Sequence, residues 1–102
     1  MVYKMRFVQT FDKGASKRFL ELERNFIELE KRTPGMKCGR RFVSVTGREP
    51  TNTMVWEADY DTLEAAVEAL QAIEGNTEHD KLLDEQARYM RDAYVEIYRE
   101  LE

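Results

Sequence analysis

The sequence predicts one α+β domain over residues 1–102, a four-stranded antiparallel sheet with its helices on one face. Two observations predict this class. Stretches in which apolar and polar residues alternate are separated by stretches in which apolar residues recur at helical spacing, in the order β-α-β-β-α-(α)-β. The composition, 42% hydrophobic and 35% charged, is that of a folded globular chain, and a chain of this length forms a single core.

Residues 2–11 predict the first strand, because Tyr3, Met5 and Phe7 alternate with residues on a more polar face. After a break at residues 12–14, apolar residues at helical spacing predict an amphipathic helix of about five turns. This helix ends before Pro34, because proline lacks the N–H group that continues the helical hydrogen bonds. Its buried stripe contains Ala15, Phe19, Leu22, Phe26 and Leu29.

Residues 36–46 and 53–60 predict the two strands of a hairpin, because the segment between them is rich in Gly, Pro and Asn. Alternation divides these strands into a face toward the helices and an opposite face with Val43, Val45 and Val55. Cys38 would lie on the first face as a buried, unreactive thiol. The residues expected on the helix side are Met36, Cys38, Phe42, Met54, Trp56, Ala58 and Tyr60.

A second helix is expected to begin at Asp61, whose spacing to Glu64 is that of a capping box, and to end at Gly75. Residues 77–91 predict a third helix, and residues 94–98 predict the closing strand. With right-handed crossovers, the two βαβ halves give a ferredoxin-like arrangement of the sheet and helices.

The charge of the chain argues against nucleic acid and anionic membranes as partners. The 20 acidic and 16 basic residues give a net charge of −4. The two halves differ, because residues 1–51 contain 12 Lys and Arg against 6 Asp and Glu, whereas residues 52–102 contain 4 against 14. We expect these opposite charges to pair within the subunit or across a dimer.

The single cysteine excludes an intramolecular disulfide, and the N-terminal residues lack the apolar core of a signal peptide. Both observations favour a cytoplasmic protein. No apolar run has the length that spans a bilayer, so we expect no membrane partner.

Helices cover only one face of such a sheet, and the other face mixes valines with charged residues. That face is too apolar for a wholly solvated surface and too charged for a core. We therefore expect a symmetric homodimer packed through it, with a monomer as the alternative. The expected interface residues are Arg6, Val8, Arg41, Val43, Val55 and Glu57.

Residues 54–65, which read Met-Val-Trp-Glu-Ala-Asp-Tyr-Asp-Thr-Leu-Glu-Ala, resemble the strand-to-helix signature Trp-x-x-x-Tyr-x-Ser/Thr-Leu of NIPSNAP-like proteins. The segments Asp12-Lys13-Gly14 and Pro34-Gly35 are similar to turns of the same family. This family is a branch of the dimeric α/β-barrel superfamily, to which the antibiotic-biosynthesis monooxygenases are related. The resemblance implies a homodimer whose two sheets form a barrel, with a pocket between sheet and helices in each subunit.

Two positions depart from superfamily patterns that accompany activity. Branches that hold haem or activate oxygen use an asparagine on the first strand and a histidine on a helix, whereas Phe7, Gln9 and Thr10 occupy this stretch here. Many NIPSNAP-like proteins carry an aromatic residue early in the third helix, where this chain has Glu78 or His79. Haem is therefore an alternative rather than the expected cofactor, and we expect no metal site.

The aromatic residues predict either plain core or a pocket for a flat ligand. Arg40 would either hold a carboxylate group of that ligand or belong to a solvated or salt-bridged strand. His79, the only histidine, is either an exposed helix residue or, with Tyr94, a catalytic candidate. The expected function is binding of a small aromatic or carboxylated molecule. The alternatives are a monooxygenase- or isomerase-like enzyme of the superfamily and a structural or interaction module without a ligand. The expected ligand-binding residues are Trp56, Tyr3, Phe7, Phe42 and Arg40.

Overall fold

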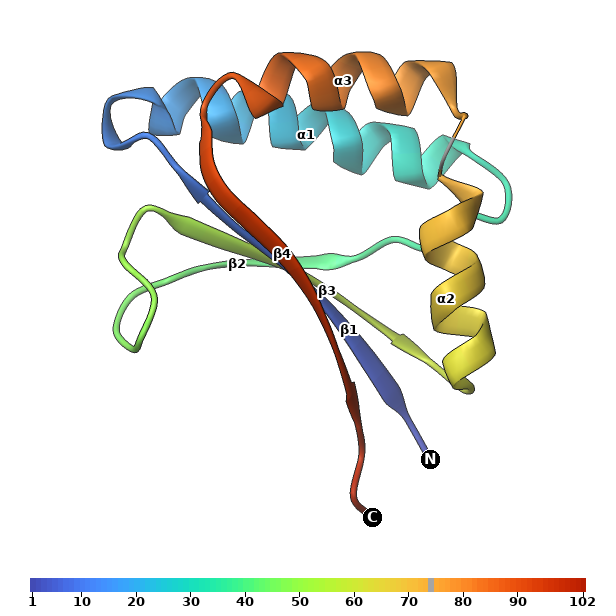
Figure 1. Ribbon diagram of the computed structural model, residues 1–102. Helices are drawn as coiled ribbons and strands as arrows, with labels where there is room; N and C mark the ends of the chain where they lie inside the picture. The colour runs from blue at the N-terminus through green and yellow to red at the C-terminus, as the bar shows by residue number, and fades with distance from the viewer. Residues whose placement is uncertain (74) are drawn as a thin grey trace.

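The structure, a computed structural model, describes residues 1–73 and 75–102. Its four strands form one antiparallel sheet in the order β2-β3-β1-β4. In Figure 1, α1 and α3 run side by side over one face of the sheet and α2 lies beside them, so the predicted α+β, ferredoxin-like architecture is confirmed. The elements are β1 (Tyr3–Phe11), the 3₁₀ turn η1 (Lys13–Ala15), α1 (Ser16–Arg32), β2 (Arg40–Val43), β3 (Thr53–Tyr60), α2 (Leu63–Ala72), α3 (Thr77–Ala87) and β4 (Met90–Arg99).

The apolar stripe of α1 forms the centre of the core, as predicted. Phe19, Leu22 and Leu29 are almost completely buried, with exposed fractions of 0 to 1%. Phe19 stacks on Phe11 of β1, with the ring centroids 4.5 Å apart. Full burial of one such side chain contributes about 1.5–3 kcal/mol, so this stripe holds α1 on the sheet.

Several predicted boundaries are wrong by a few residues. Strand β2 covers only residues 40–43 of the expected extended segment. Thr62 rather than Asp61 caps α2, since its side-chain oxygen accepts a hydrogen bond of 3.0 Å from the amide three residues later. Helix α3 ends at Ala87, and Met90 already belongs to β4. Within residues 1–73 and 75–102, no helix combines the length and the apolar character needed to cross a membrane.

The faces predicted for β2 are reversed. Arg41 pairs with Trp56 of β3, and directly paired residues share a face of the sheet, so Arg41 points toward the helices. Phe42 and Arg40 lie on the open face, where the Arg40 guanidinium is 5.3 Å from the centroid of the Phe42 ring. The prediction extended the alternation of residues 36–38 into the strand, but these residues precede β2. An error of one residue in the alternation exchanges the two faces.

The faces predicted for β4 are also reversed. Val95 lines a cavity on the helix side, and Ile97 packs on the core cluster beneath α2. Tyr94 and Tyr98 are exposed on the open face. Both faces of this strand are apolar, so alternation did not indicate which one the helices cover. Cys38, predicted as a buried thiol, is exposed.

Candidate functional site

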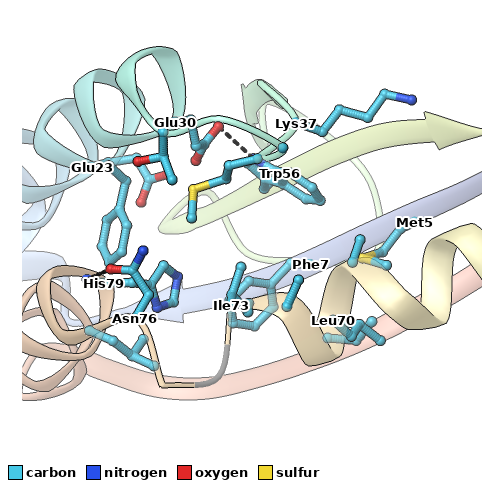
Figure 2. Close-up of a pocket in the computed structure, with 18 of the residues that line it drawn as sticks. Met5, Phe7, Glu23, Glu30, Lys37, Trp56, Leu70, Ile73, Asn76 and His79 are labelled. Carbon is cyan, nitrogen blue, oxygen red and sulfur yellow. Dashed lines mark hydrogen bonds between the residues drawn. The ribbon is translucent and has the colours of Figure 1, made fainter.

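A cavity of about 400 Å³ lies between the sheet and the three helices. Met5 and Phe7 of β1 and Trp56 of β3 line it on the sheet side, while Phe26 of α1 and Ile73 after α2 line it on the helix side. Figure 2 shows the labelled side chains of the strands and the helices around one common space. The lining is mainly apolar with a few polar groups, which is typical of sites that bind small molecules.

The Trp56 indole forms one wall of the cavity, and Gly39 leaves room for it. Trp56 pairs with Phe7 of β1 and with Arg41 of β2, which orients its ring toward the helices. A Cβ atom at Gly39 would lie 1.9 Å from the indole Nε1, far inside van der Waals contact. The same Nε1 donates a hydrogen bond of 3.4 Å to Glu30 Oε1. The lack of a side chain at position 39 therefore allows the aromatic wall to form.

Two glutamates of α1 and one arginine of β2 form a buried ion cluster at the cavity wall. Arg41 donates to Glu23 Oε2 through Nε at 2.7 Å and to both carboxylate oxygens of Glu30, to Oε1 at 2.9 Å. These three side chains are only 8 to 13% exposed. Gln86 of α3 donates to Glu23 Oε1 at 2.9 Å, and the Gly39 amide donates to Glu30 Oε1 at 3.0 Å. Figure 2 shows both glutamates projecting from α1 toward the cavity.

The ion cluster contains one cation for two carboxylates. Burial works against the charged guanidinium, but the hydrogen bonds and charges of Glu30 and Glu23 outweigh it and hold the pKa of Arg41 above its usual value. Arg41 also donates to the backbone oxygen of Gly39 at 3.2 Å, so acceptors of the protein already occupy its guanidinium group. Arg41 therefore has little capacity left to bind an anionic ligand.

His79 lies in the first turn of α3 and faces the cavity. Asn76 caps this helix, because its side-chain oxygen accepts a hydrogen bond of 2.9 Å from the His79 amide. The His79 ring meets Phe26 edge-on, with centroids 5.2 Å apart. Burial lowers the pKa of His79, and nearby carboxylates offset this effect only in part, so the imidazole is neutral at neutral pH. The alternative that His79 is an exposed helix residue is wrong.

The structure brings together some of the residues predicted for ligand binding. Trp56 and Phe7 line the cavity, and His79 joins them from α3. Tyr3 is half-buried at the beginning of β1 and is not among the described residues that line the cavity.

Other predicted site residues lie on the opposite face of the sheet. Phe42 and Arg40 are exposed there, and Phe42 has an exposed fraction of 45%. Tyr94 is also on this face, where its hydroxyl donates a hydrogen bond of 2.5 Å to Glu49. The hydrogen bond to Glu49 raises the pKa of Tyr94 from the ordinary value of 10 to about 12, which holds the phenol in its protonated form. The predicted catalytic pair of His79 and Tyr94 is therefore divided by the sheet.

Sequence reasoning missed Glu23 and Glu30, although a signal was present. They are seven positions apart, about two helical turns, and each follows a leucine of the apolar stripe of α1. Charged residues on a buried stripe require partners, because an isolated charge is costly to bury. Arg41 is that partner, but the sequence analysis placed it on the open face of the sheet, away from the helix that carries Glu23 and Glu30.

The open face of the sheet carries a second ionic group. Arg6 donates to Glu57 at 3.0 Å and to Glu96 at 3.3 Å. Arg41, predicted for the dimer interface, points to the helix side instead. Val43, at the end of β2, is 49% exposed and borders the hollow on the open face. Five of the six predicted interface residues border the hollow on the open face: Arg6, Val8, Val43, Val55 and Glu57.

The cavity residues do not fit a haem group. The only histidine packs edge-on against Phe26, and the buried ion cluster has two carboxylates and one guanidinium, which leaves it no free cation for the propionates of haem. In the described part of the chain, no group of three or more His, Cys, Asp and Glu side chains is placed to hold a metal ion.

Comparison with known proteins agrees with the fold. No family profile matches the sequence, and no curated protein matches it. A NIPSNAP family protein from Agrobacterium tumefaciens, of known structure, is 13% identical and gives a TM-score of 0.79, with 97% of this chain and 92% of that chain covered. An uncharacterised NIPSNAP-like domain protein from Burkholderia xenovorans is 15% identical with a TM-score of 0.75, over 98% and 85% of the two chains.

A putative antibiotic biosynthesis monooxygenase from Nitrosomonas europaea is 19% identical with a TM-score of 0.71, over 98% of this chain and 90% of that chain. At these identities the likeness concerns the fold and carries no activity across. The structure neighbours nevertheless agree with the resemblance read from residues 54–65. The chain therefore has the ferredoxin-like fold of NIPSNAP family proteins and of antibiotic biosynthesis monooxygenase proteins.

Proposed function

We propose that the protein binds a small aromatic molecule in the cavity between the sheet and the helices. The observation that carries this proposal is a space of about 400 Å³ lined mainly by apolar and aromatic side chains, with polar groups gathered at one wall. Sites for small molecules have this character, because apolar walls supply affinity and a few fixed polar groups orient the ligand. The rings of Trp56 and Phe7 offer surfaces on which a flat ligand stacks.

The geometry favours an aromatic ligand over a carboxylated one. Arg40, the residue expected to hold a carboxylate, lies on the opposite face of the sheet. Arg41 does face the cavity, but it is already paired with Glu23 and Glu30. A ligand carboxylate would therefore meet two buried anions without a free cation to balance them.

The same geometry gives less support to an enzyme. In the enzyme hypothesis, one substrate would contact Trp56, Tyr94, His79 and Arg40. Tyr94 and Arg40 lie across the sheet from the cavity, so these four side chains do not surround one space. Two similar structures are described as a putative antibiotic biosynthesis monooxygenase and as an antibiotic biosynthesis monooxygenase. They are only 19% and 16% identical to this chain, so they share its fold and indicate no activity. Binding is therefore the function that the cavity supports best.

An uncharged fluorescent aromatic, 1-aminoanthracene, tests the proposal. We expect its fluorescence to rise saturably with the wild-type protein, because the cavity shields the dye from water. Ala69→Phe fills the cavity from α2 and should abolish the rise. Val67→Phe adds the same ring at an exposed position of the same helix and should leave the rise unchanged.

Two outcomes would contradict the proposal. The first is no saturable rise with wild-type protein. The second is an equal rise with Ala69→Phe when its circular dichroism spectrum is native. Either outcome would favour the structural or interaction module without a ligand.

We further propose that two copies pack through the open face of the sheet to form a homodimer. This face presents exposed aromatic side chains, namely Phe42, Tyr94 and Tyr98, which are 45%, 37% and 49% exposed. Arg6 and its glutamate partners lie on the same face and offer charges for pairing across a twofold axis. A mixed apolar and ionic face of this kind is typical of an interface between subunits.

A further inference from the structure

We propose that the cavity prefers aromatic ligands that bear a cationic ammonium group, and that it binds carboxylates with the same aromatic ring more weakly. This inference rests on the proposed function, because it names the class of molecule that the same cavity takes. Its basis is the charge of the cavity wall and the hydrogen-bonding capacity that remains on one glutamate.

The buried ion cluster of the wall carries one more negative than positive charge. Glu23 and Glu30 share the single guanidinium of Arg41, and all three side chains are at most 13% exposed. Water screens buried charges poorly, so the surplus negative charge acts strongly on anything that enters the cavity. A cationic ligand group lowers the energy of this arrangement, whereas an anionic group raises it.

Glu23 is the residue that has room for a ligand. Its carboxylate accepts hydrogen bonds from Arg41 and Gln86, whereas an ionised carboxylate has about four acceptor sites. Glu30, in contrast, accepts from Arg41, from the Gly39 amide and from Trp56. An ammonium group in the cavity would therefore bind at Glu23.

The other basic groups near the cavity do not offset the surplus. Lys37 is exposed at the rim, where its ammonium group contacts the backbone oxygen of Asp59 and lies 4.5 Å from the centroid of the Tyr60 ring. Figure 2 shows its side chain directed away from the cavity. His79 lines the cavity, but burial lowers its pKa, so it adds no positive charge at neutral pH.

The aromatic walls also favour a cation. Trp56 and Phe7 present ring faces with negative electrostatic potential, to which a positive charge within about 6 Å is attracted. The cavity thus combines apolar contact for a ring with two sources of attraction for a positive charge. A carboxylate with the same ring keeps the apolar contact and loses both attractions.

Three molecules with the same indole ring and ethyl linker test the inference: tryptamine, tryptophol and indole-3-propionate, which are cationic, uncharged and anionic at neutral pH. Their affinities are measured by isothermal titration calorimetry at low salt and pH 7.5, and by displacement of 1-aminoanthracene. We expect tryptamine to bind more tightly than indole-3-propionate by about tenfold or more, with tryptophol between them.

Glu23→Gln removes the surplus charge and keeps the shape of the side chain. We expect this variant to bind tryptamine about tenfold more weakly and to lose the preference for tryptamine over tryptophol. Glu28→Gln removes one charge from the same helix at a side chain that is 69% exposed, and it should keep the wild-type preference. If Glu23→Gln does not fold, the order of the three affinities in the wild-type protein still decides the question.

The outcomes separate the inference from the proposed function. Binding of all three molecules with equal affinity, or tightest binding of indole-3-propionate, overturns the charge preference while the cavity remains a binding site. Binding by none of them, together with no response to 1-aminoanthracene, overturns both. The inference would also be overturned if Glu28→Gln reduced the preference for tryptamine as much as Glu23→Gln did. The net charge of the protein, rather than Glu23, would then cause the preference.

Discussion

Trp56 forms the aromatic wall of the cavity only because residue 39 has no side chain. The irregular segment before β2 passes directly over the indole, and a Cβ atom at Gly39 would overlap the ring at 1.9 Å from Nε1. The backbone of Gly39 also donates to Glu30, which in turn accepts from the indole. One glycine thus positions both the apolar and the ionic part of the wall.

Gly39→Ala should therefore destabilise the protein and move its only tryptophan. We expect the free energy of unfolding to fall by about 1–3 kcal/mol, the usual cost of overpacking, with a changed emission of Trp56. Urea titration and fluorescence measure both effects. Gly14→Ala is the control, since its Cβ meets no atom within 4 Å. Equal stability and unchanged emission of Gly39→Ala would contradict this description of the wall.

His79 makes the stability of the protein depend on pH. Burial lowers its pKa from the ordinary value of 6.5, with Asp80 of α3 and Glu30 and Glu23 of α1 acting in the opposite direction. The unfolded chain then binds a proton at a higher pH than the folded chain does. The contribution of neutral His79 to the free energy of unfolding is therefore present above pH 6.5 and is lost as the pH falls below that value.

Comparison with His79→Gln isolates this contribution. Between pH 7.5 and pH 5.5, we expect the urea midpoint of the wild-type protein to fall further than that of the variant, which has no group titrating at position 79. An equal fall in both proteins would show that the imidazole has the same pKa in the folded and unfolded chains.

At the scale of elements, β2 decides which arginine faces the cavity. The strand has four residues, and its pairing with β3 sends Arg41 to the helices and Arg40 to the open face. Two consecutive residues of the same type therefore lie in opposite environments. This difference provides a direct comparison within the chain.

Arg41→Met should destabilise the fold strongly, because it leaves Glu23 and Glu30 buried without their cation. We expect a loss of about 3–5 kcal/mol at neutral pH. Arg40→Met, the matched change one residue earlier on the exposed side, should cost about 0.5 kcal/mol or less. Chemical denaturation measures both values. A larger loss for Arg40→Met would mean that the faces of β2 are those first predicted from the sequence.

The element order was predictable from the sequence, because long segments carry a clear period. The stripe of α1 repeats over 17 residues, and alternation in β1 and β3 separates a helix side from an open side. The short β2 has too few residues to set its own phase, and both faces of β4 are apolar. Pairing with β3 and β1, which only the folded chain reveals, determined these two strands.

The candidate site was predictable only in its aromatic part. Trp56 and Phe7 lie on well-patterned strands, so their shared face followed from alternation. The ion cluster joins Glu23 and Glu30 of α1 to Arg41 of β2, and a partner so distant in sequence depends on the register of a short strand. Cross-sheet placement of this kind has no local signal in the chain.

At the scale of the whole molecule, the basic first half and the acidic second half meet inside one subunit. Arg6 pairs with Glu57 on the open face of the sheet, and Arg32 of α1 pairs with Glu78 of α3. Arg18 and Glu85 form a further pair between the same two helices. The uneven charge of the sequence thus becomes complementarity between elements that pack together. The pairs between α1 and α3 are exposed and are screened by salt.

The open face of the sheet leads to a prediction about assembly. Phe42→Glu places a charge on this face and should raise the dissociation constant of the dimer about tenfold or more. Val67→Glu makes the same change on α2, where the side chain is 39% exposed, and should leave the dimer intact. Sedimentation velocity at micromolar concentration compares the three proteins. A wild-type protein that sediments as a monomer would contradict the homodimer.

The proposed binding of an aromatic molecule in the cavity between sheet and helices can be tested at Trp56. The indole N–H of Trp56 reports on it directly, since the chain has one tryptophan and its resonance in a ¹H–¹⁵N spectrum needs no assignment by mutation. This N–H lies at the cavity wall and donates to Glu30. Titration with tryptophol should shift the Trp56 resonance saturably, and Ala69→Phe should abolish the shift. A Trp56 resonance that stays fixed while tryptophol is added to millimolar concentration would contradict the proposed binding.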